Sequence, residues 1–164
     1  IYHDQTLFKE PGGGHTPWHQ DQTYWPLESD RTITMWLPLA EITEEVGSMY
    51  FVSGSHARGE FGAGPISDSS HHKIQEWIEE NDSPVRTHGE MAVGDATFHS
   101  GFTLHSAKAN PTMKTRPILT VIYVADQTRI LDPTPMQEFD LKLWLGGRQP
   151  GDVVDSEINP QLYP

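Results

Sequence analysis

The sequence predicts an all-β fold, a sandwich or a barrel, and two observations support this prediction. Glycine (14 residues) and proline (13 residues) are plentiful among the 164 residues. They separate short segments of alternating or continuous apolar residues, which is typical of all-β proteins. No internal repeat or linker divides the chain, so we expect one domain over residues 1–164, a size that buries a full core.

The most regular predicted strand covers residues 32–39. Ile33 and Met35 lie on one face of this strand, and Thr34 and Trp36 lie on the other, because side chains alternate across a strand. The second face is therefore available for a pocket.

Three further segments predict strands, and turn residues bound the first two. They are residues 49–52, residues 96–98, which overlap a longer candidate over 97–104, and residues 118–124. The last is a β-branched run with almost no polar alternation, so we expect a strand that is buried on both faces.

One peripheral helix is predicted around residues 70–80. Ile74, Trp77 and Ile78 recur there at helical spacing with acidic residues opposite, so the helix should pack against the outside of the β core. Residues 126–164 are rich in proline and polar residues, and they predict an irregular tail that wraps the domain.

The charge balance excludes several classes of partner. Eleven basic against 23 acidic residues give a formal charge of −12, which repels nucleic-acid phosphate and anionic lipid. The longest apolar run, 117–124, is far too short to cross a bilayer, and no charged-then-apolar leader opens the sequence. We expect a cytoplasmic protein that acts on a small molecule. With no cysteine, any metal site must use His, Asp or Glu.

His19 and Asp21 are the first candidate metal ligands. One residue separates them, and on an extended segment both side chains would project to the same face. His105 follows at the end of the candidate strand 97–104. Two imidazoles and one carboxylate form the facial triad that favours non-haem Fe(II) with open coordination positions. The alternative for His19 and Asp21 alone is a hydrogen-bonded surface pair.

Arg116 stands just before the predicted buried strand. Its guanidinium could bind a carboxylate bidentately inside a cavity, whereas the alternative is an arginine at the surface edge of a strand. Because a buried charge without a partner is costly, an inward Arg116 would imply an anionic ligand or an acidic neighbour.

Several motifs carry a family resemblance. They are KEPGGG (9–14), PWHQDQTYW (17–25), TMWLPL (34–39), GSM (47–49), GSH (54–56) and GDATFH (94–99), followed by His105, Asn110, Arg116 and the closing segments 151–152 and 159–163. In this order, and over nearly its whole length, the chain resembles the phytanoyl-CoA dioxygenase-like (PhyH) family of Fe(II)/2-oxoglutarate-dependent oxygenases.

The resemblance implies a double-stranded β-helix, which is a cupin-like jelly roll with iron at its mouth. By motif position His19, Asp21 and His105 resemble the metal ligands. Arg116 resembles the arginine that binds the distal carboxylate of 2-oxoglutarate. Relatives also carry an N-terminal helical region, which we expect this chain to lack.

Two further residues resemble co-substrate contacts of the family. Trp36 resembles the tryptophan of the co-substrate pocket, and its alternative is an ordinary packed aromatic residue. Ser106 is a weaker candidate, because the family often has a hydroxyl two residues after the distal histidine, where this chain has Ala107. His99 is the main rival ligand, and we assign it no metal role.

The implied cofactors are Fe(II), 2-oxoglutarate as co-substrate, and O2. The implied reaction hydroxylates a small organic substrate, with succinate and CO2 as co-products. Related halogenases have a small residue where this chain has Asp21, so the carboxylate favours hydroxylation. Two alternatives remain: a cupin-like metalloenzyme that does not use 2-oxoglutarate and gives Arg116 no role, and a catalytically inactive PhyH-like binding module.

Overall fold

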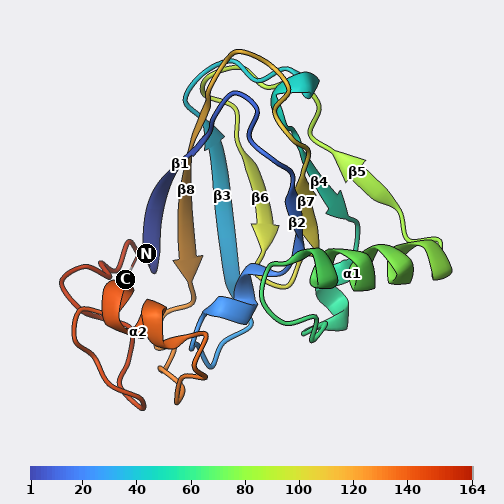
Figure 1. Ribbon diagram of the computed structural model, residues 1–164. Helices are drawn as coiled ribbons and strands as arrows, with labels where there is room; N and C mark the ends of the chain where they lie inside the picture. The colour runs from blue at the N-terminus through green and yellow to red at the C-terminus, as the bar shows by residue number, and fades with distance from the viewer. Residues whose placement is uncertain (164) are drawn as a thin grey trace.

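The computed structural model describes residues 1–163 as two antiparallel sheets with helices at one end of them (Figure 1). The strands are β1 (His3–Lys9), β2 (Thr16–His19), β3 (Thr32–Pro38), β4 (Met49–Val52), β5 (Val85–Thr87), β6 (Thr97–Ser100), β7 (His105–Ala107) and β8 (Arg116–Val124). The helices are α1 (Asp68–Glu80) and α2 (Glu138–Trp144), with 3-10 turns η1 (Asp21–Tyr24), η2 (Glu44–Val46) and η3 (Ser55–Arg58). The predicted all-β fold is confirmed.

Each sheet has four strands, in the orders β1-β8-β3-β6 and β2-β7-β4-β5. Neighbouring strands come from distant parts of the chain, so β1 (blue) lies beside β8 near the end of the chain (Figure 1). The register of the first sheet places His3, Ile122, Thr34 and His99 in one row across four strands. This row faces the site described below.

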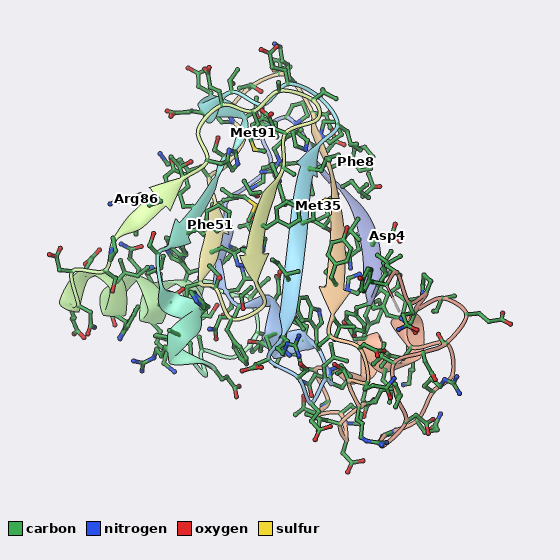
Figure 2. All side chains as sticks on the ribbon, turned by 180° about the vertical axis from the view of Figure 1, so that it is seen from behind. Asp4, Phe8, Met35, Phe51, Arg86 and Met91 are labelled. Carbon is green, nitrogen blue, oxygen red and sulfur yellow. The ribbon has the colours of Figure 1, made fainter. Side chains whose placement is uncertain are left out.

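The inner face of β3 is its more polar face. Thr34 and Trp36 are buried, whereas Ile33 is 41% exposed. Met35 on β3 and Phe8 on β1 belong to the outward face of this sheet (Figure 2). The predicted pocket face of β3 is therefore confirmed, because it lines the cavity between the sheets.

Helix α1 matches the predicted peripheral helix. Ile74 and Ile78 are buried and pack with Trp18 and Leu104 against the second sheet. The helix begins earlier than the apolar spacing indicated, because Ser67 forms a capping box at its N-terminus.

The candidate strand over 97–104 is wrong. β6 ends at Ser100, where the Thr103 amide donates to the Ser100 carbonyl at 2.8 Å and closes a turn. The chain then crosses to the second sheet, so His105 opens β7 instead of ending β6.

Two smaller expectations are also corrected. β8 alternates between buried and half-buried residues, since only one of its faces points into the core. The tail is largely irregular, as predicted, but it includes α2, which is followed by the fully buried Leu145. Among residues 1–163, no helix has the length and apolar character needed to span a membrane.

Candidate metal centre

His19 and Asp21 meet at the point where a strand becomes a turn. His19 is the last residue of β2, and Asp21 is the first residue of η1, so the expectation of one extended segment is wrong. Gln20 between them stabilises the backbone where the strand becomes a turn, because its side-chain amide donates to the carbonyls of Phe102 at 2.6 Å and Gly59 at 2.9 Å. His19 Nε2 still lies 3.5 Å from Asp21 Oδ1.

His105 completes the group from the neighbouring strand. It pairs with His19 in the antiparallel register of β2 and β7, and the two ring centroids are 4.1 Å apart. His105 Nε2 lies 3.4 Å from Asp21 Oδ1. Ligand atoms of His19, Asp21 and His105 all lie within 4.8 Å of one another, so the structure brings together the three predicted ligands.

Both imidazoles present the same nitrogen to the centre of this group. His19 Nδ1 lies 2.8 Å from the Pro17 carbonyl, and His105 Nδ1 lies 2.9 Å from the Thr103 carbonyl. A carbonyl only accepts, so each Nδ1 carries the proton and each Nε2 keeps a free lone pair. This is how metal-binding histidines are commonly oriented. The donor set therefore fits a divalent transition metal.

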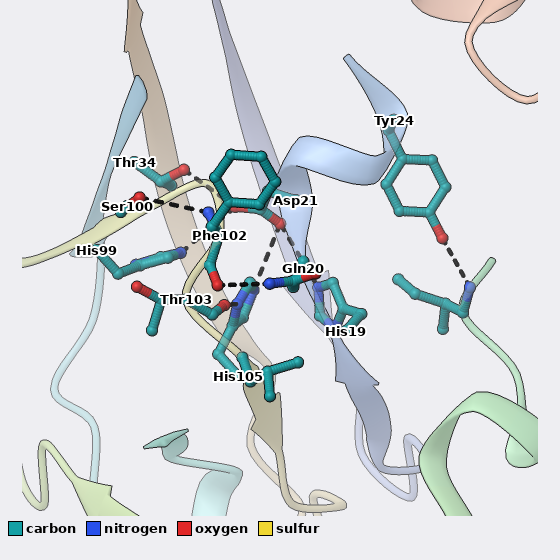
Figure 3. A network of polar contacts seen from close by, with 12 residues as sticks. His19, Gln20, Asp21, Tyr24, Thr34, His99, Ser100, Phe102, Thr103 and His105 are labelled. Atoms are coloured by element: carbon teal, nitrogen blue, oxygen red, sulfur yellow. Dashed lines mark hydrogen bonds and ion pairs between the residues drawn. The ribbon is translucent and has the colours of Figure 1, made fainter. Parts of the chain in front are cut away.

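Asp21 is oriented by two residues that sequence reasoning missed as site residues (Figure 3). The Thr34 hydroxyl donates to Asp21 Oδ2 at 3.0 Å, and His99 Nε2 lies 3.4 Å from the same oxygen. Oδ1 is left beside His19 and His105. His99 lies outside the three-residue group, and it contacts Asp21 because it pairs with Thr34 across β6 and β3, a register that the sequence pattern does not reveal.

The environment of Asp21 keeps its carboxylate ionised. Burial by itself raises the pKa of Asp21, but the adjacent imidazole of His105, together with those of His19 and His99, holds that pKa well below its usual value. Burial lowers the pKa of His19 and so favours its neutral, metal-binding form. The group thus offers a divalent ion one negatively charged carboxylate together with imidazole nitrogens.

The three residues lie in a cavity of about 430 Å³ that Arg116, Trp36 and Ser106 also line. Arg116 is 7% exposed and donates from Nη1 to the Gly47 carbonyl, while its buried Nε has no partner among the described residues. Its guanidinium carbon lies 5.3 Å from the centre of the Trp36 ring. The surface alternative for Arg116 is therefore wrong.

Arg116 remains a cation in this cavity. Burial lowers its pKa to about 10, which still lies well above neutral pH. No carboxylate of residues 1–163 forms an ion pair with it. The nearby Lys9 is occupied by protein oxygens, namely the carbonyls of Gly14 and Lys108 and the hydroxyl of Thr16. An anionic ligand at Arg116 would supply the missing partner.

Solved structures of similar shape support the fold assignment. The epimerase SnoN, in complex with Fe3+, alpha ketoglutarate and nogalamycin RO, aligns with a TM-score of 0.76 and 26% identity over 96% of this chain and 62% of that chain. The non-heme alpha ketoglutarate dependent carbocyclase SnoK aligns with a TM-score of 0.73 and 26% identity over 94% of this chain and 58% of that chain. The double-stranded β-helix is confirmed.

Curated relatives give the same assignment. A probable alpha-ketoglutarate-dependent hypophosphite dioxygenase of Stutzerimonas stutzeri is 30% identical over 131 residues, 76% of this chain and 45% of that protein. A probable phytanoyl-CoA dioxygenase of Caenorhabditis elegans is 28% identical over 138 residues, 76% of this chain and 42% of that protein. The chain thus spans a little under half the length of these relatives.

The family match covers the whole of the group described above. The model of the family named phytanoyl-CoA dioxygenase (PhyH) matches residues 1–118, a stretch that includes His19, Asp21, His105 and Arg116. With most of the chain matched and its clustered His-Asp-His residues inside the match, this protein belongs to the PhyH family of Fe(II)/2-oxoglutarate-dependent oxygenases.

Proposed function

We propose that this protein hydroxylates a small organic substrate and uses Fe(II), 2-oxoglutarate and O2, with succinate and CO2 as co-products. One observation carries the proposal: the His19, Asp21 and His105 group shares a single cavity with a buried arginine that has no acidic partner. A metal site and an arginine that can bind a carboxylate, both lining one cavity, suit a co-substrate with an acid group at each end.

The three ligand residues would hold Fe(II) on one face. Their ligand atoms converge within 4.8 Å of one another, and all three residues line the cavity. Three coordination positions would then remain for two oxygens of 2-oxoglutarate and for O2. When bound, this assembly supplies the oxidant: one atom of O2 enters succinate, the other enters the substrate as hydroxyl, and 2-oxoglutarate loses CO2.

Arg116 would bind the distal carboxylate of 2-oxoglutarate. Its Nη1 is used by Gly47, while its buried Nε is free to donate. Trp36, 4% exposed, packs against the guanidinium and would shield this charge pair from water. Ser106 lines the same cavity and would add a hydroxyl contact to the co-substrate.

Asp21 favours hydroxylation as the outcome. Its carboxylate is held by Thr34 and His99, so it would fill one metal position permanently and leave no place there for an exogenous halide. The substrate would lie on the cavity side of the metal and receive the oxygen atom directly.

Calorimetric titration of 2-oxoglutarate into the Mn(II)-loaded protein tests this proposal. We expect one site per chain and an affinity about 10-fold to 100-fold weaker in Arg116→Gln, since charge-assisted hydrogen bonds contribute roughly 1.5–3 kcal/mol. Arg86→Gln changes an exposed arginine on β5 and should leave the affinity unaltered. Absence of binding to the wild type, or equal affinities in Arg116→Gln and wild type, would favour the cupin-like alternative.

A further inference from the structure

The cavity has a second polar end, formed by the start of β1 and by α2. His3 is 6% exposed, Asp140 is 9% exposed, and both line the cavity that contains the metal group. We propose that His3 and Asp140 form a subsite that binds a hydroxyl group of a hydroxylated, ring-containing substrate. This proposal deepens the function proposed above and rests on it for the identity of the reaction.

The two side chains belong to one packed cluster. The Tyr2 hydroxyl donates to Asp140 Oδ2 at 3.0 Å, and the Tyr2 ring lies 4.8 Å from the His3 ring. His3 also stacks on Trp144 of α2, with centroids 4.6 Å apart and 14° between the planes. Both positions are thereby fixed before any ligand arrives, as a binding site requires.

Hydrogen-bonding capacity is left unused in this cluster. Asp140 Oδ1 and His3 Nε2 have no hydrogen-bond partner among residues 1–163, and neither atom is fully buried. Both residues line the cavity, so these two atoms keep surface that a ligand can reach. A polar group of a ligand between His3 and Asp140 would use this capacity.

The cluster lies within reach of the metal group. His3 is in register with Ile122, which is in register with Thr34, the residue that holds Asp21. Two strand spacings place the His3 backbone roughly 10 Å from that of Thr34. Arg116 lies in a different direction, along β8. A substrate held at His3 and a co-substrate held at Arg116 can therefore approach the metal from different sides.

The chemistry of this end favours a hydroxyl. Burial lowers the pKa of His3 to about 4, so its imidazole is neutral at pH 7 and can donate one hydrogen bond. A hydroxyl can donate to Asp140 and accept from His3. An ammonium could satisfy only Asp140, and a carboxylate would be repelled by Asp140. Among the described residues, Arg116 is the one lysine or arginine that lines the cavity.

Aromatic side chains suit the ring of such a substrate. Tyr24, Trp25 and Phe139 line the cavity beside this polar pair. Flat aromatic faces bind the apolar faces of a saturated ring, while the polar pair takes its hydroxyl groups.

Three six-membered-ring probes test the subsite: trans-cyclohexane-1,2-diol, cyclohexylamine and cyclohexanecarboxylate. They are titrated into 15N-labelled, Zn(II)-loaded protein with 2-oxoglutarate present, and the indole resonances of Trp25 and Trp144 report binding. We expect the diol to bind best and its affinity to fall about tenfold in both Asp140→Ala and His3→Phe. The second variant retains a ring to stack on Trp144, so it tests the subsite even if Asp140→Ala does not fold. Glu138→Gln, on the same helix, is the matched control and should bind the diol as the wild type does.

The proposal is overturned if the diol does not bind, if both variants bind it as the wild type does, or if the amine or the carboxylate binds best. A parallel titration with 2-oxoglutarate tests the proposed function independently of the subsite. Diol binding that depends on His3 and Asp140 supports the subsite even where 2-oxoglutarate fails to bind. Normal 2-oxoglutarate binding without diol binding overturns the subsite alone.

Discussion

The Thr34 hydroxyl donates a 3.0 Å hydrogen bond to Asp21 Oδ2, and so the first sheet fixes a carboxylate that belongs to a turn beside the second sheet. Oδ1 of the same carboxylate is left facing His19 and His105. The geometry of the metal group therefore depends on contacts between the two sheets as well as on the three ligand residues.

Thr34→Val removes this hydrogen bond while it keeps the shape of the side chain. We expect the affinity for Fe(II) to fall about tenfold, since loss of a group that orients a metal ligand commonly costs 10-fold to 100-fold. Anaerobic competition with a coloured chelator measures the change. Thr6→Val, at an exposed position of β1, is the control. An unchanged affinity in Thr34→Val would mean that Asp21 is oriented by other contacts.

His105→Ala removes one of the three predicted ligands. Its effect should exceed the roughly 100-fold upper range for an orienting residue, because a donor atom itself is lost. The same competition measurement applies, with His72→Ala as the control on the exposed face of α1. Undiminished affinity in His105→Ala would show that the third ligand lies elsewhere, with His99 the next candidate.

Gly101→Ala should destabilise the turn that carries the chain from β6 to β7. A Cβ at this position would lie 2.5 Å from Thr32 Oγ1 and 2.6 Å from Gln22 Oε1. We expect the free energy of unfolding to fall by about 1–3 kcal/mol, the usual cost of overpacking. Gly14→Ala meets no atom within 4 Å and should change stability by less than about 0.5 kcal/mol. Urea unfolding compares them, and equal stabilities would show that the turn can relax around a side chain.

The His3 and Asp140 pair predicts two opposed pH dependences of stability. Burial lowers the pKa of His3 from 6.5 to about 4, so the unfolded chain takes up a proton in this window that the folded chain does not, and stability falls as pH falls. Burial raises the pKa of Asp140 from 3.8 to about 6, so the folded chain retains a proton that the unfolded chain loses, and stability falls as pH rises. The two contributions oppose each other between about pH 4 and pH 6.

Substitution should separate these contributions. Relative to the wild type, unfolding free energy should rise more steeply with pH in Asp140→Asn and less steeply in His3→Phe. Urea unfolding of the metal-free protein across this window measures both slopes, and Glu138→Gln should follow the wild type. Parallel curves for all four proteins would contradict the assigned pKa shifts.

The alternation of β3 and the periodicity of α1 were predictable because both depend on neighbours along the chain. Thr34 and Trp36 could be placed on a pocket face from the pattern alone. His19, Asp21, His105 and Arg116 could be selected because their residue types restrict the chemistry that they can perform.

Other features depend on contacts between distant segments. The turn before His105 is set by the close approach of Gly101 to Thr32, which no local pattern reveals. His99 contacts Asp21 only because β6 pairs with β3 in one particular register. Asp140 lines the cavity because α2 packs against the N-terminal end of the chain, where the Tyr2 hydroxyl donates a hydrogen bond to Asp140.

The visible absorption of the Fe(II)-loaded protein on anaerobic addition of 2-oxoglutarate tests the central claim most directly. Chelation of the iron by the keto and carboxylate oxygens of the co-substrate gives a metal-to-ligand charge-transfer band. We predict this band for the wild type, and at limiting 2-oxoglutarate we predict a weaker band for Arg116→Ala. No band from the wild type, or an equal band from Arg116→Ala at limiting 2-oxoglutarate, would contradict the account.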